Sequence, residues 1–156
     1  MPPLRHITNL FRGRPAVEPA EADRYGAAVQ PLLQDLYELF VRWRQDLELD
    51  SPEEGLANAA SIQRWQAASI RDQLVAVERP VAFSKLHDDL GTIALDTARA
   101  AQLLSNGYRF HSSRARCDGH ALMLTAEARL DALLRALADY GVSVEHAAHD
   151  AAGSGQ

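Results

Sequence analysis

The residues whose types and spacing come nearest to metal chemistry lie between positions 111 and 120. Cys117 and His120 are three residues apart, so a helix places them on adjacent turns, and thiolate and imidazole are both common zinc ligands. His111 supplies a third ligand only if the connection before the helix folds back. Cys117 falls nearly opposite the apolar stripe of its helix, and His120 falls at the flank. We therefore expect no bound metal or cofactor, and keep His111, Cys117 and His120 as candidate ligands.

Arginine and aromatic side chains gather in the same stretch, residues 106–120. Guanidinium groups pair with carboxylates and phosphates, and aromatic side chains are enriched at protein interfaces. One interpretation is a solvated, mildly basic end of the fold. The alternative is a contact surface for an acidic partner or a phosphate group. The candidate partner-binding residues here are Tyr108, Arg109, Phe110, Arg114 and Arg116.

His87 lies near the start of a predicted helix, at the edge of its apolar stripe. The dipole at a helix N-terminus disfavours the protonated imidazole. We expect a boundary histidine that is hydrogen-bonded to a carboxylate, with Glu127 and Asp131 of the last helix nearby. The alternative is a catalytic base or a pH sensor.

Sequence signatures of several cofactor and catalytic sites are missing. The chain contains no Glu-x-x-His or His-x-x-x-His pair, no Gly-x-Gly-x-x-Gly, no phosphate-binding Gly-x-x-x-x-Gly-Lys and no Gly-x-Ser-x-Gly. Catalysis is therefore left open, with a non-enzymatic role favoured.

Apolar residues recur at alternating three- and four-residue spacing in four stretches, 21–49, 52–78, 81–105 and 113–140. Such spacing places them on one side of an α-helix. Four helices of about 40 Å, joined by short links, bury their stripes against one another. The sequence predicts an all-α, antiparallel up-down-up-down four-helix bundle. The clearest stripe consists of Met123, Ala126, Leu130, Leu133, Leu137 and Tyr140.

Turn and capping residues predict where the helices begin and end. The first stripe stays in phase across Pro31, which favours one kinked helix over two. Ser51 is a suitable N-cap for the second helix, and Pro80 ends that helix. Asn106-Gly107 is expected to stop the third helix. Ser112 or Ser113 caps the fourth helix, and Gly141 ends it.

The two ends of the chain differ in composition from the middle. Residues 1–20 form an expected flexible basic segment, residues 21–141 the bundle, and residues 142–156 a disordered tail. Within residues 4–14, Leu4, Ile7, Leu10 and Phe11 could line one side of a short helix, with arginines nearby. The alternative to a loose segment there is docking on a partner protein or peripheral contact with an anionic membrane surface.

Trp65 is the large apolar residue that the stripes leave unexplained. It falls well away from the stripe of the second helix, among small residues such as Ser61 and Ala68. A tryptophan on such a surface suits an interface anchor for a protein partner or a second copy of the chain. Asymmetric packing, or an N-terminal segment folded over it, is the competing interpretation. Trp43 belongs to the first stripe and is expected in the core.

Bulk composition limits the partners and the compartment. The chain has 156 residues, a net charge of −5 and a single cysteine, so one domain without an intrachain disulfide is expected. The acidic body argues against nucleic-acid binding. No apolar run approaches a membrane span, and the N-terminus lacks the apolar core of a signal peptide. We expect a cytoplasmic protein.

The run from Pro80 to Leu90 (Pro-Val-Ala-Phe-Ser-Lys-Leu-His-Asp-Asp-Leu) precedes an alanine-rich helix and the sequence Leu-Leu-Ser-Asn-Gly-Tyr ending at Tyr108. This pattern resembles uncharacterised helical-bundle proteins of bacteria, whose third helix often opens with a proline and then carries Leu-His. The resemblance covers about residues 25–140 and implies a four-helix fold without an activity. Many such proteins are exported lipoproteins, whereas this chain has no lipobox cysteine.

Together these features favour a non-enzymatic interaction or accessory protein that binds another protein. The alternative is a helical-bundle sensor that binds a small molecule or a metal through His87 or through the group at 111–120.

Overall fold

The structure is a computed structural model that describes residues 18–145. In this range the chain forms four α-helices, α2 (Pro19–Glu48), α3 (Glu53–Ala76), α4 (Ser84–Arg109) and α5 (Ser113–Ala138), and one 3₁₀ turn, η1 (Val81–Phe83). The described residues include no β-strand. The predicted all-α four-helix fold is therefore confirmed.

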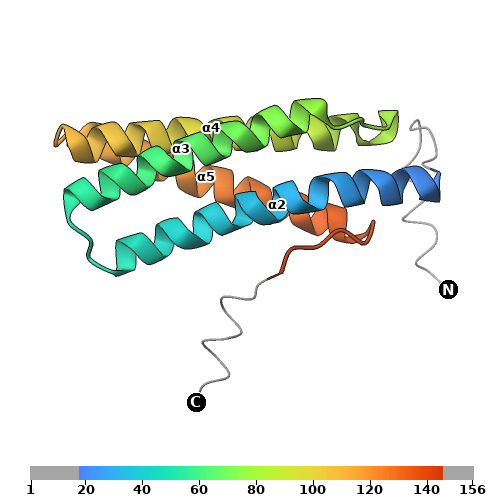
Figure 1. Cartoon of the computed structure of the whole chain (residues 1–156), viewed down its shortest axis with the longest axis horizontal. Helices are drawn as coiled ribbons and strands as arrows, with labels where there is room; N and C mark the ends of the chain where they lie inside the picture. Colours follow the sequence, from blue (N-terminus) through green and yellow to red (C-terminus); the bar gives the residue numbers. More distant parts are fainter. Residues whose placement is uncertain (1–17, 146–156) are drawn as a thin grey trace, which may run out of the picture.

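Contacts between helix ends show how the four helices run (Figure 1). Arg109 at the end of α4 reaches Asn58 near the start of α3, so these two helices are antiparallel. Tyr25 near the start of α2 bonds to His87 near the start of α4, so these two are parallel. The three-residue link 110–112 then sends α5 back along α4. The predicted up-down-up-down path follows from these contacts.

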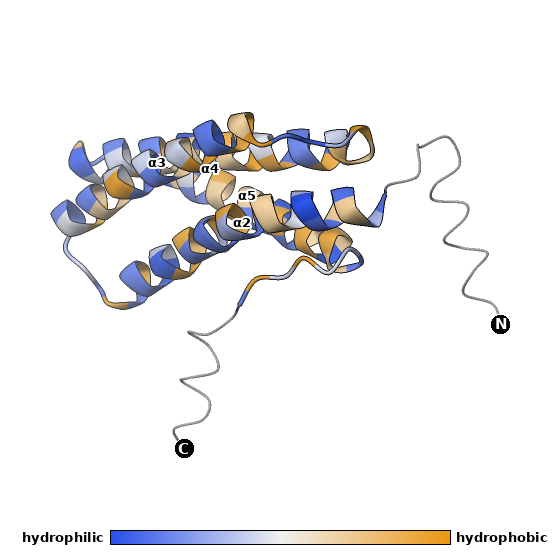
Figure 2. Cartoon of the chain, turned by 45° about the vertical axis from the view of Figure 1, so that its right-hand side comes forward, coloured by the Kyte–Doolittle hydropathy of each residue, from blue (hydrophilic) through white to orange (hydrophobic). Residues whose placement is uncertain are grey.

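The apolar stripes pack together in one buried cluster, and within residues 18–145 no aspartate, glutamate, lysine or arginine is buried. Figure 2 shows hydrophobic and hydrophilic residues interspersed along each helical ribbon. Five of the six residues in the clearest predicted stripe are buried in α5, and Tyr140 packs at its edge. Burial of this apolar surface is the main favourable term in folding. The largest fully buried side chains are Phe40, Phe83, Leu33, Leu36, Leu39, Leu74, Leu90, Leu104, Leu130, Leu137, Val29 and Thr97.

Gly107 corrects one predicted helix end. We expected Asn106-Gly107 to stop the third helix, but α4 continues to Arg109 and the chain turns at His111, whose φ is 55°. A Cβ at Gly107 would lie 2.7 Å from the backbone nitrogen of Arg116. Glycine is therefore present because α5 passes against α4 at this point, and the prediction of a stop was wrong.

Small residues also bring α4 close to α5 at a second point and close to α3. A Cβ at Gly119 of α5 would lie 3.0 Å from the backbone nitrogen of Leu104. On the opposite side, the hydroxyl groups of Ser61 in α3 and Ser105 in α4 are 2.7 Å apart. These small residues allow the backbones of α3, α4 and α5 to pack closely, because a larger side chain would separate them.

The other helix ends differ from expectation in two places. Ser51 does not cap α3, because Pro52 occupies the N-cap position and no side chain makes the capping bond. The third helix begins at Ser84 because residues 81–83 form a 3₁₀ turn after Pro80. The hydroxyl of Ser112 does cap α5, accepting a hydrogen bond from the N–H of Ala115 at 3.2 Å.

Two further predictions, one about a proline inside the first helix and one about the end of the last helix, agree with the structure. The first helix runs through Pro31 as one helix. Gly141, with a φ of 78°, follows the end of α5 in the left-handed region expected there.

The chain after α5 packs on α2 for a short distance. Val142 and Val144 are buried, and Gln34 makes a reciprocal pair with the backbone of Glu145, in which the amide donates at 3.1 Å and accepts at 2.7 Å. Residues 142–145 of the expected tail thus belong to the packed structure. Pro19 and Ala20, placed in the expected N-terminal segment, begin α2. Residues 1–17, which include the segment 4–14, and residues 146–156 lie outside the described range.

Across residues 18–145, none of the helices has the length and apolar character needed to cross a membrane.

Candidate functional site

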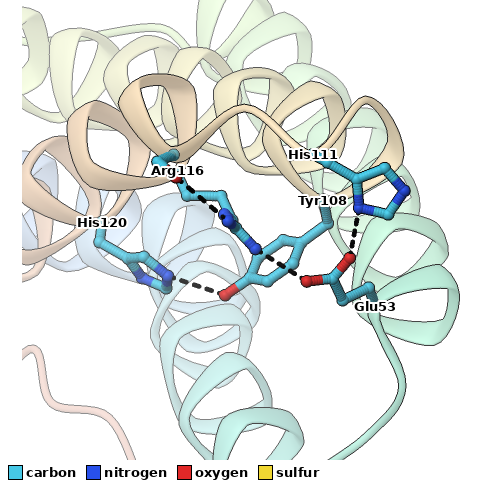
Figure 3. A network of polar contacts seen from close by, with 6 residues as sticks. Glu53, Tyr108, His111, Arg116 and His120 are labelled. Carbon is cyan, nitrogen blue, oxygen red and sulfur yellow. Dashed lines mark hydrogen bonds and ion pairs between the residues drawn. The ribbon is translucent and has the colours of Figure 1, made fainter.

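A network of polar and aromatic side chains closes the end of the bundle where α4 turns into α5 (Figure 3). The guanidinium of Arg116 donates to Glu53 of α3 at 2.9 Å and lies over the ring of Tyr108, 5.6 Å from its centre. The other carboxylate oxygen of Glu53 lies 2.6 Å from Nδ1 of His111. One carboxylate thereby ties the start of α3 to both sides of the α4–α5 turn.

The inner part of this network is a tyrosine–histidine pair. The Tyr108 hydroxyl and Nε2 of His120 are 3.0 Å apart, and the indole ring of Trp43 in α2 packs against both rings. Burial, with a smaller effect of Arg116, lowers the pKa of His120 below its ordinary value of 6.5. Burial also raises the pKa of Tyr108. A neutral imidazole and a protonated phenol therefore meet near neutral pH.

The three candidate metal ligands do not converge. His111 faces Glu53, His120 faces Tyr108, and Cys117 is exposed on the outside of α5. Over the described range, no group of three or more histidine, cysteine, aspartate or glutamate side chains is arranged to hold a metal ion. The positive φ of His111 turns this residue toward the start of α3, a feature that residue spacing along α5 does not reveal.

The candidate partner-binding residues at this end divide into two groups. Tyr108 and Arg116 belong to the internal network and hold helices together. Phe110 is 70% exposed, and the side chain of Arg114 projects into solvent, 3.8 Å from Asp118. Arg109 is also exposed and contacts Asn58 at 3.5 Å. The outward group is the one that a partner would meet.

Trp65 lies on the outward face of α3. Its side chain is 70% exposed, and Ile62, one turn earlier, is 59% exposed. The core residues of α3, such as Ala60, Ala67 and Leu74, lie on the opposite side of the helix. Arg64 stands over the indole ring, 5.5 Å from its centre. Neither the described helices nor residues 142–145 cover this face.

His87 is buried and joins three helices. Its Nε2–H donates to the carbonyl oxygen of Leu74 in α3 at 2.9 Å, so its Nδ1 accepts from the hydroxyl of Tyr25 in α2 at 3.0 Å. Burial is the main cause that lowers the pKa of His87. Burial likewise raises the pKa of Tyr25 to about 12. The imidazole is thus held neutral, with both ring nitrogens engaged.

The partners of His87 differ from those expected. We predicted a carboxylate from Glu127 or Asp131, but Glu127 is ion-paired with Arg44 of α2. His87 instead reaches the backbone carbonyl of Leu74 in the last turn of α3, which also accepts from the N–H of Val77 and has no bond from a residue four positions later. The carbonyl groups in the last turn of a helix are available as acceptors, and a search for charged partners of His87 overlooks them.

Compared with models of protein families, with curated proteins and with solved structures, the chain matches none of them. Over residues 18–145 the fold is an all-α bundle with polar networks at both ends and exposed aromatic side chains at Trp65 and Phe110. Its function is inferred from these residues.

Proposed function

We propose that this protein is a non-enzymatic interaction module, which binds another protein through the outward face of α3 around Trp65. The observation that carries the proposal is the exposure of Trp65, at 70%, in the middle of an ordered helix. Tryptophan is strongly enriched among the residues that contribute most to protein binding. Burying this ring against a partner would remove a large apolar surface from water.

The surroundings of Trp65 suit a contact surface. Ile62 adds a second exposed apolar side chain, and Ser61 and Ala68 are too small to shield the ring. Arg64 packs over the indole, which restricts its motion and reduces the entropy that binding would cost. An anchor that is already ordered is the arrangement expected of a protein-binding face.

The exposed residues of the α4–α5 turn extend the same surface. Because Arg109 contacts Asn58, the end of α4 lies beside the start of α3. Asn58 is seven residues from Trp65, or about 10 Å along the helix axis. We propose that one partner of ordinary size, covering about 800 Å², contacts Trp65 together with Phe110 and Arg114, with Phe110 as a second aromatic contact and Arg114 as a positive charge.

The buried His87 and the half-buried His120 serve packing in this proposal. Both nitrogens of His87 are engaged with Tyr25 and Leu74, and His120 is engaged with Tyr108. These bonds connect helices at the two ends of the bundle. They therefore support a rigid scaffold that presents α3.

Affinity capture with matched surface variants tests the proposal. The full chain and its Trp65→Ala and Leu124→Ala variants are used as baits in lysate from the cells that produce the protein. Leu124 is also exposed, at 66%, but lies on α5. Light scattering on each purified variant measures self-association. We expect one specific complex, with a partner or a second copy, that Trp65→Ala loses and Leu124→Ala keeps. Equal recovery with both variants would reject Trp65 as the anchor.

A second candidate function, binding of a small molecule, is favoured by a groove between α3 and α4.

A further inference from the structure

A groove runs between the last turns of α3 and the first turns of α4. It has a volume of about 500 Å³, within the range of small-molecule sites in proteins. The lining residues are Arg71, Leu74, Val75, Val77, Arg79, His87, Asp88, Gly91, Thr92 and Leu95. The groove is distinct from the Trp65 face, since Val75 is ten residues further along α3, or about 15 Å.

Apolar groups form the walls of this groove. Leu74, Val75 and Val77 come from α3 and its end, and Leu95 comes from α4. Gly91 borders open space, since a Cβ at this position would meet no atom within 4 Å. A larger side chain here would extend into the groove. By contrast, Gly107 in the same helix is closed off by α5. An aliphatic chain could therefore lie across Gly91 in contact with valine and leucine side chains.

One of the positively charged side chains at the groove has no ion-pair partner among residues 18–145. Arg79 is ion-paired with Asp88, whereas Arg71 forms no ion pair within residues 18–145. His87 lies in the floor of the groove as a neutral ring, with both nitrogens bonded inside the protein. Arg71 is thus the group that offers free donors to a ligand. Its planar guanidinium matches the two oxygens of a carboxylate.

We propose that the α3–α4 groove binds a small apolar monocarboxylate, with its carboxylate on Arg71 and its hydrocarbon chain over Gly91. A single negative charge fits because only one guanidinium is uncommitted, and Asp88 would repel a second anionic group. The apolar walls require a hydrocarbon portion, because a small hydrophilic anion would leave them in water.

A second groove, on another side of α3, does not share these properties. It lies between α2 and α3, has a volume of about 260 Å³, and is lined largely by polar residues. Asp35 stands there together with Arg42, so an anion would meet both signs of charge. This second groove serves as an internal control.

Octanoate titration of the ¹⁵N-labelled full chain tests the proposal, with octanol and octylamine as neutral and cationic probes of the same chain length. Amide shifts report the position of binding, and the Gly91 amide is the nearest probe. We expect saturable octanoate binding with shifts centred on residues 71–77 and 87–95. Octanol should bind more weakly, and octylamine more weakly still.

Two variants separate the contributions of charge and shape. Arg71→Gln should weaken octanoate binding about tenfold and leave octanol binding unchanged, because one charge-assisted contact is lost. Gly91→Leu should weaken both about tenfold or more by filling the groove, and leucine favours the helix. Arg42→Gln and Gly55→Leu are matched controls outside the groove and should bind as the unmodified chain does.

Three results would overturn the proposal: no saturable binding of octanoate, an octanoate affinity in Arg71→Gln or Gly91→Leu equal to that of the unmodified chain, or shifts centred on the α2–α3 groove. Trp65→Ala should bind octanoate normally. Failure of the protein-binding proposal therefore leaves this result unaffected, and the converse also holds.

Discussion

The hydroxyl of Tyr25 and Nδ1 of His87 are 3.0 Å apart, although 62 residues separate them in the chain. Because Nε2 of the same imidazole donates to Leu74, one side chain joins α2, α3 and α4 at a buried point. Phe83 stacks on Tyr25 and receives the edge of Tyr140, which extends the contact to the end of α5. Helices α2, α3 and α4 therefore meet at this pair, and the chain just after α5 reaches the neighbouring Phe83.

Removal of the His87 imidazole should destabilise the fold. His87→Ala leaves the Tyr25 hydroxyl without its partner and removes one of the two donors to the Leu74 carbonyl, which still accepts from the N–H of Val77, and we expect a loss of about 2–4 kcal/mol in the free energy of unfolding. Urea denaturation followed by circular dichroism measures this loss. Asp89→Ala, an exposed neighbour, should change stability by less than about 0.5 kcal/mol. Similar values for the two variants would show that the His87 contacts contribute little.

Acid should weaken the fold through the buried His87 and the half-buried His120. The pKa of His87 is lowered by burial, with Arg79 and Asp88 as opposing charges nearby, and the pKa of His120 by burial and Arg116. Both folded-state pKa values lie below the ordinary 6.5 of the unfolded chain. Below pH 6.5 the unfolded chain therefore binds more protons, so the stabilising contribution falls as the pH drops toward the folded pKa.

Denaturation midpoints between about pH 7.5 and 5.5 test this dependence. The double variant His87→Gln and His120→Gln should show a shallower pH dependence than the unmodified chain. Glu127, whose pKa is raised from 4.5 by burial, acts in the opposite direction. A pH dependence that the double variant leaves unchanged would contradict the role given to these histidines.

Alanine should have opposite effects at two glycines of α4. Gly107→Ala places a Cβ 2.7 Å from the backbone of Arg116, and we expect a loss of about 1–3 kcal/mol from the resulting separation of α4 and α5. Gly91→Ala meets no atom within 4 Å, and should gain about 0.5–1 kcal/mol from helix propensity. Thermal unfolding of the two variants measures whether each substitution raises or lowers the stability. A stabilised Gly107→Ala protein would contradict the close packing of α4 on α5.

The two tryptophans should respond very differently to truncation. Trp43 is 3% exposed and Trp65 is 70% exposed. Trp43→Ala should cost about 3–5 kcal/mol through the cavity it leaves, whereas Trp65→Ala should cost less than about 1 kcal/mol. Equilibrium unfolding measures both values. A large loss at Trp65 would mean that this ring contributes to folding and not to a partner contact.

The sequence predicted the helices well because their apolar residues have a regular period. The stripe around Leu130 is buried as expected, and Ser112 caps α5. Gly107 misled the prediction of a helix end, because glycine favours a helix stop and also permits close helix packing. Only the position of α5 against α4 distinguishes the two.

The site residues were less predictable because their partners lie on other helices. The bond from His87 to a backbone carbonyl has no side-chain signature. The pairing of His111 and Arg116 with Glu53 depends on a positive φ at the turn. The exposure of Trp65 could be predicted from its place outside the apolar stripe. The groove at Gly91 could not be predicted, because its walls come from both α3 and α4.

The central claim is that the α3 face around Trp65 contacts a protein, and site-specific photocrosslinking in the producing cells tests it most directly. Ile62, exposed and one turn from Trp65, is replaced by benzoylphenylalanine, with Leu124 on α5 replaced in a control. We predict one discrete crosslinked product from position 62, which disappears when Trp65→Ala is added, and none from position 124. No product from position 62, or one that persists with Trp65→Ala, would contradict the claim.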